Sequence, residues 1–210
     1  RRQRQMCIRD RGNSIGVGTV MHHFFAYMAR MRFIDRWALM RNSYTENIQE
    51  HSHQVAILAH ALAVLRNEYF GGQVDAGAVA VAALYHDASE ILTGDLPTPI
   101  KYDNPDIQSA YQQVEAVAVG KLLSMLPEEL RPAYEEALTI PDPEVRVLVK
   151  AADKLSAYLK CVEELKAGNS EFKKAREQTY AALCRNPIPA LSYFMEHFLD
   201  GFELTLDELN

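Results

Sequence analysis

Apolar residues recur every three or four positions along most of the chain, which is the spacing of amphipathic α-helices. Two stripes are especially regular. The first consists of Ile48, His51, Val55, Leu58, Leu62 and Leu65, and the second of Val145, Leu148, Ala152, Leu155, Leu159 and Val162. Valine and isoleucine do not alternate with polar residues over strand-length stretches. The pattern therefore predicts an all-α fold.

Glycine and proline divide this pattern into about seven or eight helices, because both residues disfavour a helix interior. We expect the helices at about 22–35, 47–67, 75–92, 105–126, 127–138, 144–167, 170–185 and 189–199. Gly168-Asn169 is typical of a C-terminal cap for the 144–167 helix. The segment 93–104, which contains Gly94 and Pro97, is predicted to be a loop.

Composition favours one globular domain in a reducing compartment. The chain has 210 residues, of which 48% are hydrophobic and 24% charged, and a domain of this size needs no disulfides. The cysteines Cys7, Cys161 and Cys184 form no CxxC pair, which favours the cytoplasm. The longest uninterrupted apolar run, 78–85, is far shorter than the ~20 residues that span a bilayer.

Charge argues against a nucleic-acid polymer as partner. The net charge is −6, and five arginines lie within residues 1–20, so the rest of the chain is still more acidic. Such a surface repels long polyanions, although a few local cations could hold a small anionic substrate. We expect residues 1–20 to be a disordered or non-native extension, with Met21 as the natural start and residues 21–210 as one domain. A basic targeting arm is the alternative.

Four potential metal ligands lie on three of the predicted helices. His51 occupies a position on an apolar stripe, so its imidazole faces the interior and needs partners there. His86 and Asp87 are adjacent near a helix C-terminus, where the helix dipole disfavours a carboxylate unless a cation is bound. Asp153 lies between apolar neighbours on a later helix. Taken singly, these could also be a core histidine, solvated acids and a surface salt bridge.

Taken together, two imidazoles and two carboxylates suit Mn²⁺, Co²⁺, Fe²⁺ or Zn²⁺. An ion with an open coordination position would acidify a water molecule. Glu90 follows His86 by four residues and so lies on the same side of a helix, where it could orient that water or handle protons. If the four groups converge, the sequence predicts a metal-dependent hydrolase; otherwise it predicts a plain helical domain.

Two further segments could bind a substrate. Arg36 can contact a phosphate bidentately, and Trp37 can wall a sugar or stack on a base. The polar segment 93–98 directly follows the candidate metal helix and could hold a hydroxyl-bearing ligand. A surface cation beside a core indole, and a simple helix-stop loop, are the alternative interpretations.

These residues resemble the HD-domain metal-dependent phosphohydrolases, and among them the bacterial 5′-deoxynucleotidases of the YfbR type. The H…HD…D pattern of the family corresponds to His51, His86-Asp87 and Asp153. The resemblance covers residues 21–210. It includes Arg36-Trp37, Glu46-Asn47, Glu50-His51-Ser52, Tyr85 to Glu90, Thr93 to Pro99 and Ala157 to Cys161. The N-terminal stretch is the one departure that we note.

The resemblance implies an HD-domain helical fold and the hydrolysis of deoxyribonucleoside 5′-monophosphates to deoxyribonucleoside and phosphate. It implies one divalent cation (Co²⁺, Mn²⁺ or Cu²⁺), with Glu90 as the essential acidic residue. The implied metal ligands are His51, His86, Asp87 and Asp153. A homodimer is the usual assembly.

The resemblance also implies the substrate contacts. Arg36 would orient the phosphate and take part in catalysis, and Trp37 would crowd the 2′ position of the sugar. Asp95, Leu96, Pro97 and Thr98 would line the nucleoside, and the metal ligands His51, Asp87 and Asp153 would also contact the substrate.

Two other functions stay open. Another HD-type phosphohydrolase could act on a triphosphate, a cyclic dinucleotide or an alarmone. Two-metal members need further histidines, and the remaining ones here follow no ligand pattern; they are His22, His23, His53, His60 and His197. A non-catalytic helical binding protein is the second alternative, although every ligand position is intact.

Overall fold

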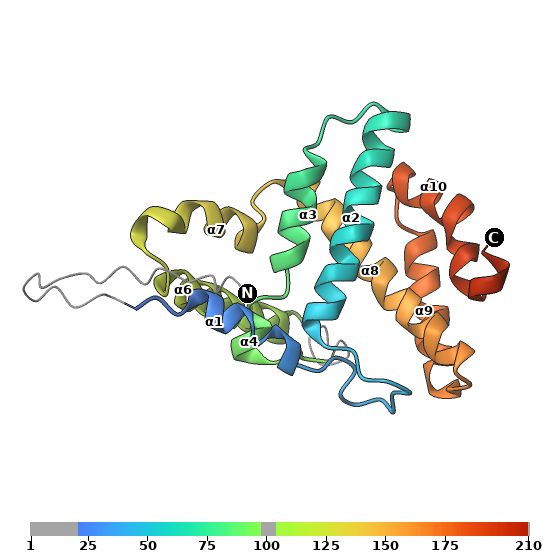
Figure 1. The fold of residues 1–210 in the computed structure, drawn as a ribbon, viewed down its shortest axis with the longest axis horizontal. Helices are drawn as coiled ribbons and strands as arrows, with labels where there is room; N and C mark the ends of the chain where they lie inside the picture. The colour runs from blue at the N-terminus through green and yellow to red at the C-terminus, as the bar shows by residue number, and fades with distance from the viewer. Residues whose placement is uncertain (1–20, 98–103, 210) are drawn as a thin grey trace, which may run out of the picture.

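The computed structural model describes residues 21–97 and 104–209 (Figure 1). The predicted all-α fold is confirmed: within these ranges, the one β-type pairing is an isolated antiparallel bridge between Asp35 and Asn47. The predictions for residues 1–20 and for Thr98 lie outside the described residues. None of the described helices is both long enough and apolar enough to cross a membrane.

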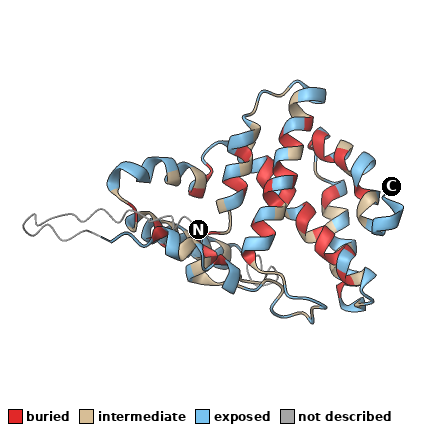
Figure 2. Cartoon of the chain, in the orientation of Figure 1, coloured by how far each residue is buried: buried red, intermediate tan, exposed pale blue. Residues whose placement is uncertain are grey.

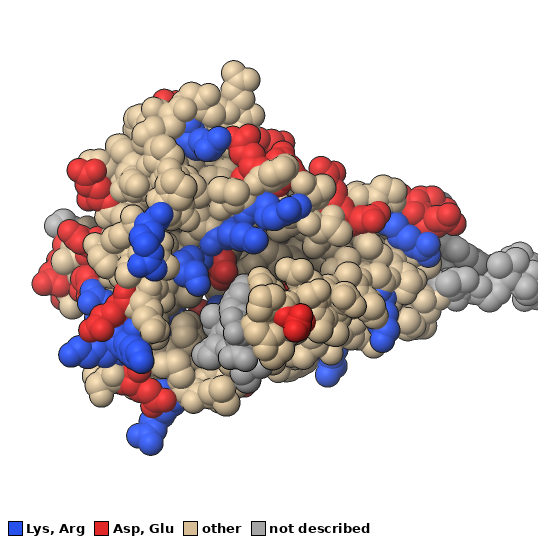
Figure 3. Space-filling view, turned by 180° about the vertical axis from the view of Figure 1, so that it is seen from behind, with Lys and Arg blue, Asp and Glu red and all other residues tan. Residues whose placement is uncertain are grey.

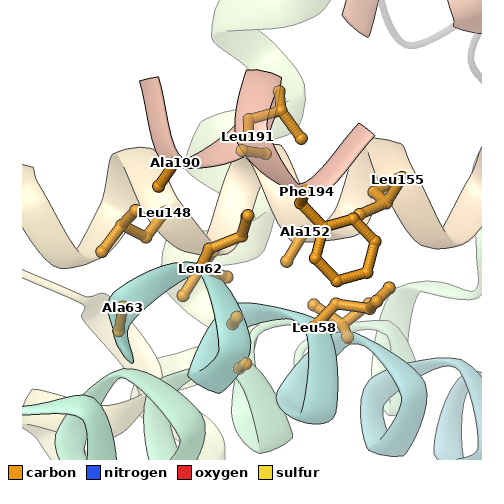
Figure 4. Close-up of a cluster of buried hydrophobic side chains, with 14 of the residues drawn as sticks. Leu58, Leu62, Ala63, Leu148, Ala152, Leu155, Ala190, Leu191 and Phe194 are labelled. Carbon is orange, nitrogen blue, oxygen red and sulfur yellow. The ribbon is translucent and has the colours of Figure 1, made fainter. Parts of the chain in front are cut away.

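Helix α2 (Ile48–Phe70) is the centre of the fold and packs against α3 (Ala76–Tyr85), α8 (Pro143–Lys166) and α10 (Pro189–Phe198). Figure 4 shows where three of these helices meet, through Leu58, Leu62 and Ala63 of α2, Leu148, Ala152 and Leu155 of α8, and Ala190, Leu191 and Phe194 of α10. In Figure 2 the buried residues follow the facing sides of the central helices. The two predicted apolar stripes therefore form the main core.

A second, smaller cluster of buried residues is separate from the main core. It is formed by Phe24, Ala88, Leu122, Leu126 and Leu138. These residues come from or adjoin α1 (Phe24–Met28), the turn that follows α3, α6 (Pro105–Ser124) and α7 (Arg131–Thr139). The remaining elements are α4 (Glu90–Thr93), α9 (Lys173–Cys184) and the 3₁₀ helices Met31–Phe33, Glu128–Leu130, Ser170–Phe172, Leu199–Glu203 and Leu206–Glu208.

Local capping fixes the ends of the two longest helices. The Asn47 side chain accepts hydrogen bonds from the Gln49 and Glu50 amides and, with the Glu50 side chain, forms a capping box that starts α2 one turn before His51. The predicted cap of α8 is present. Gly168 has φ +83°, and the Asn169 N–H donates to the Glu164 carbonyl at 2.9 Å, as in a Schellman motif.

The prediction of one continuous helix over 22–35 is wrong. Helix α1 ends at Met28, and Ile34 adopts an extended conformation. The reason is a tertiary pairing, because the Ile34 carbonyl accepts from the Ile48 N–H at 2.9 Å and the Arg36 N–H donates to the Glu46 carbonyl at 2.8 Å. This pairing ties the segment to the start of α2.

The prediction of one helix over 75–92 is also wrong. Helix α3 ends at Tyr85, and a turn over 86–89 separates it from α4. The His86 ring bonds the Ala83 carbonyl at 2.8 Å, which is the acceptor that a continuing helix would offer to the Asp87 N–H. The chain tightens there, with the Ala88 N–H donating to the Tyr85 carbonyl at 3.0 Å.

Candidate metal centre and active site

The four predicted metal ligands come together from α2, the 86–89 turn and α8. His51 is fully buried, and its Nε2 lies 3.1 Å from Asp153 Oδ1 and 3.6 Å from Asp87 Oδ2. His86 Nε2 lies 3.2 Å from the same Asp87 oxygen. One ligand atom from each of His51, His86 and Asp153 lies within 4.8 Å of the others. The arrangement has the size and chemistry of a site for one cation.

The second nitrogen of each imidazole is already engaged. His51 Nδ1 lies 3.2 Å from the Ser156 hydroxyl oxygen, and His86 Nδ1 donates to the Ala83 carbonyl at 2.8 Å. His86 Nε2 is buried and makes no hydrogen bond in the described part of the chain. A neutral imidazole in this tautomer presents a lone pair on Nε2, and such outer partners orient metal-binding histidines. These residues therefore fit a divalent cation.

The electrostatics of the site keep its carboxylates charged. Burial opposes ionisation of Asp87, but His86, His51 and Arg36 outweigh it and hold the pKa of Asp87 well below its usual range. Burial also opposes ionisation of Asp153, but the hydrogen bond and charge of His51 lower its pKa to about 2. For His86, burial alone would lower the pKa, and the attraction of Asp87 raises it instead.

Arg36 contacts the centre directly. Its Nη1 donates to Asp87 Oδ2 at 3.2 Å and its Nε donates to Glu46 Oε2 at 3.1 Å. Burial would lower its pKa, but surrounding carboxylates raise it, so the guanidinium stays charged. Those carboxylates are Asp87, Asp153, Glu46 and Asp95. Trp37 follows with φ +59°, and its Nε1 donates to Glu46 Oε2 at 3.0 Å.

Glu90 begins α4 and is 4% exposed. Its N–H donates to the Asp87 carbonyl at 3.0 Å, so the turn between α3 and α4 joins it to the candidate ligand. Glu90 is therefore a buried acid at the start of a helix and not an acid solvated at a helix C-terminus.

A cavity of about 340 Å³ borders His86, Asp87 and Asp153. Its other walls come mainly from α6 and α8 and include Tyr111 and Lys150. Figure 3 shows Lys and Arg side chains close together across the middle of one face, although the whole chain is acidic. The volume lies within the range of ~300–1,000 Å³ that is usual for small-molecule sites.

The predicted nucleoside-binding loop is only partly described. Asp95, Leu96 and Pro97 follow α4 and are half-buried, and Asp95 is close enough to Arg36 to raise its pKa. Sequence reasoning assigned no role to two residues of the site, Glu46 and Ser156. Ser156 follows Asp153 by three residues and so shares its helix face, which is a signal that could have found it.

The chain matches the family described as 5′-deoxynucleotidase YfbR-like over residues 23–202. A curated 5′-deoxynucleotidase of Shewanella oneidensis is 50% identical over 192 residues, which are 90% of this chain and 98% of that protein. One of Vibrio cholerae is 51% identical over 190 residues, with the same coverage of 90% and 98%.

Two solved structures share the fold. An HD-domain phosphohydrolase of Listeria innocua has a TM-score of 0.74 at 22% identity and covers 86% of this chain and 88% of its own. The cyanophage S-2L HD phosphohydrolase, bound to dA and one catalytic Zn²⁺ ion, has a TM-score of 0.61 at 23% identity, with coverages of 86% and 96%. With a family match over most of its length and relatives at half identity, this chain belongs to the 5′-deoxynucleotidase YfbR-like family.

Proposed function

We propose that this protein is a metal-dependent 5′-deoxynucleotidase, which hydrolyses deoxyribonucleoside 5′-monophosphates to deoxyribonucleoside and phosphate. The activity agrees with the family and with the names of its half-identical relatives. The observation that carries it is the meeting of two imidazoles and two carboxylates with the Arg36 guanidinium, whose Nη1 lies 3.2 Å from Asp87 Oδ2.

The residues divide the chemistry among them. His51, His86, Asp87 and Asp153 would hold the cation. When bound, a divalent cation supplies a Lewis acid that lowers the pKa of a coordinated water and neutralises charge on phosphoryl oxygens. Arg36 has five N–H donors, of which two are used by Glu46 and Asp87, so the others can bind the phosphate.

Proton transfer and sugar recognition fall to other side chains. Glu90 would position the attacking water or accept its proton, because its side chain is buried and its backbone N–H is bonded to the carbonyl of the candidate ligand Asp87. Trp37 would crowd the 2′ position of the sugar and reject a ribose hydroxyl by bulk. Asp95, Leu96, Pro97 and Thr98 would line the nucleoside.

Several finer features belong to the same proposal. The physiological cation would be Co²⁺, Mn²⁺ or Cu²⁺, and a donor set of imidazole nitrogens and carboxylate oxygens can bind each of these ions. The protein would act in the cytoplasm as a homodimer of single-domain subunits, on small nucleotides rather than nucleic-acid polymers. Light scattering at micromolar concentration tests the dimer.

The experiment is phosphate release from matched deoxyribo- and ribonucleoside monophosphates, with and without Co²⁺ and with EDTA. We expect release from the deoxyribo substrates with Co²⁺, and none after chelation. His51→Ala should abolish it, whereas the matched control His60→Ala, which removes an exposed imidazole from the same helix, should not. Release that chelation leaves unchanged would contradict the proposal. A substrate panel with triphosphates and cyclic dinucleotides separates it from other HD-type activities.

A further inference from the structure

One carboxylate oxygen joins the two side chains that are proposed to read the substrate. Glu46 Oε2 accepts from Arg36 Nε at 3.1 Å and from Trp37 Nε1 at 3.0 Å. The Arg36 and Glu46 side chains are only 12% and 13% exposed. A shared acceptor of this kind holds a guanidinium and an indole in a fixed relation to each other.

An unusual backbone conformation of Trp37 allows both side chains to reach the same oxygen. Side chains of consecutive residues in extended chain point to opposite sides, so Arg36 and Trp37 would normally not reach the same acceptor. Trp37 adopts φ +59°, which is unusual for a bulky residue and requires support from its surroundings. The Arg36 N–H bond to the Glu46 carbonyl, at 2.8 Å, and the packing of the Trp37 ring on Phe172, with centroids 5.3 Å apart, supply that support.

The other end of Arg36 reaches the candidate metal centre. Its Nη1 donates to Asp87 Oδ2, while Nε donates to Glu46, so the guanidinium spans the two carboxylates. The planar fork of arginine transmits orientation, because fixing two of its nitrogens fixes the directions of the others. The orientation of Arg36 toward a phosphate therefore depends on where Glu46 holds it.

We infer that Glu46 is a positioning residue that couples phosphate binding at Arg36 to sugar selection at Trp37. Its carboxylate would not touch the reacting atoms and would act through these two side chains. The kinetic consequences rest on the proposed function, whereas the consequence for the Trp37 side chain does not.

Reach, rather than charge, is the property that the geometry requires. Glu46→Asp keeps the charge but withdraws the oxygen by one methylene, so it cannot serve both donors. Glu46→Gln keeps the reach and an acceptor oxygen. Glu163→Ala is the matched control. Glu163, on α8, accepts from the hydroxyl of Tyr44, which lies two residues before Glu46. No hydrogen bond joins Glu163 to Arg36 or Trp37 in the described part of the chain.

The first measurement does not require activity. Trp37 is the only tryptophan in the chain, so intrinsic fluorescence reports on this side chain alone. We expect Glu46→Asp to shift the emission to longer wavelength and to raise acrylamide quenching, while Glu46→Gln and Glu163→Ala stay close to the parent protein. Unchanged emission and quenching in Glu46→Asp, with the fold retained by circular dichroism, would overturn the inference even if the proposed activity fails.

The second measurement is kinetic. For Glu46→Asp we expect a roughly tenfold loss of kcat/KM on the deoxyribo substrate, the value of about one charge-assisted hydrogen bond, and a smaller preference for deoxyribose over ribose. In a Trp37→Ala background the same change should lower kcat/KM equally for both sugars. If Glu46→Asp lowers kcat/KM equally for both sugars in the parent protein as well as in Trp37→Ala, the role of Glu46 is only structural. That result would overturn the coupling.

Discussion

The His51 ring and the Ser156 hydroxyl meet at 3.2 Å in the buried interface between α2 and α8. This contact occupies Nδ1 and leaves Nε2 directed at Asp153 and Asp87. Ser156 is itself 2% exposed, so solvent does not compete with the ring for its hydroxyl. The contact therefore fixes which nitrogen faces a cation.

Ser156→Ala is expected to weaken Co²⁺ or Mn²⁺ binding by ~10–100-fold, the usual effect of losing an outer partner of a metal-binding histidine. Titration calorimetry on the chelator-treated protein measures it. Ser52→Ala is the matched control, because the Ser52 hydroxyl is equally buried and has no hydrogen-bond partner among residues 21–97 and 104–209. Equal affinities of the two variants would argue against the role of Ser156.

Glu90→Gln is expected to reduce kcat by ~10²–10⁴, the range of general acid–base contributions, because the amide cannot accept the proton. Metal binding should change little, since Glu90 is not among the four candidate ligands. Comparing kcat with the rise in melting temperature on adding Co²⁺ separates these effects. A variant that loses metal-dependent stabilisation together with activity would show that Glu90 serves the cation instead.

Trp37→Ala is expected to narrow the ratio of kcat/KM between deoxyribo- and ribonucleotides by roughly tenfold or more, the scale on which pockets reject a hydroxyl by shape. Trp37→Phe keeps most of the ring but loses the hydrogen bond from Nε1 to Glu46. Its ratio of kcat/KM should therefore lie between those of the parent protein and Trp37→Ala. Matched dNMP and NMP substrates give the ratio directly. No change in the alanine variant would remove the assigned role of Trp37.

Acid stability should depend on Glu164, which is fully buried on α8. Burial disfavours its carboxylate, but hydrogen bonds from Lys160, Asn169 and Ser43 outweigh it and lower its pKa to about 2. The pKa in the unfolded chain is about 4.3. The stabilisation is thus present above that value and is lost as pH falls toward 2.

Urea unfolding between pH 3 and 7 tests this dependence. Glu164→Gln should reduce the loss of unfolding free energy as pH falls. Lys160→Met should lower the free energy of unfolding by about 3–5 kcal/mol at neutral pH, because it leaves the buried charge of Glu164 unpaired. Glu171→Gln is the control, because Glu171 is an exposed acid that accepts from the Arg41 N–H, close in sequence to Ser43. If the free energy of unfolding of Glu164→Gln falls with pH as steeply as that of the parent protein, another group is responsible for the pH dependence.

Periodicity was sufficient where a residue's role follows from its own helix. The inward position of His51 follows from the stripe that also buries Leu58 and Leu62, and these positions are confirmed. The break before Glu90 was not predictable in this way, because a side-chain bond from His86 to the Ala83 carbonyl causes it and not a glycine or proline.

Contacts between distant parts of the chain account for the other differences. The 22–35 helix ends early because Ile34 pairs with Ile48, and the hydrophobic pattern around Ile34 contains no trace of that partner. The sequence assigned no role to Glu46 for a related reason, since its sharing of one oxygen between Arg36 and Trp37 depends on the left-handed backbone of Trp37. Sequence motifs therefore predicted which chemical groups form the site, whereas the orientation of these groups relative to one another became clear only from the fold.

The pairing of Arg36 with Glu46 has a mechanical consequence. Because it leads directly into the capped first turn of α2, the side chains of Arg36, Trp37 and His51 are connected through one short stretch of hydrogen-bonded backbone. A tilt of α2 is therefore expected to move all three side chains together, so that the distance between Trp37 and His51 stays nearly constant.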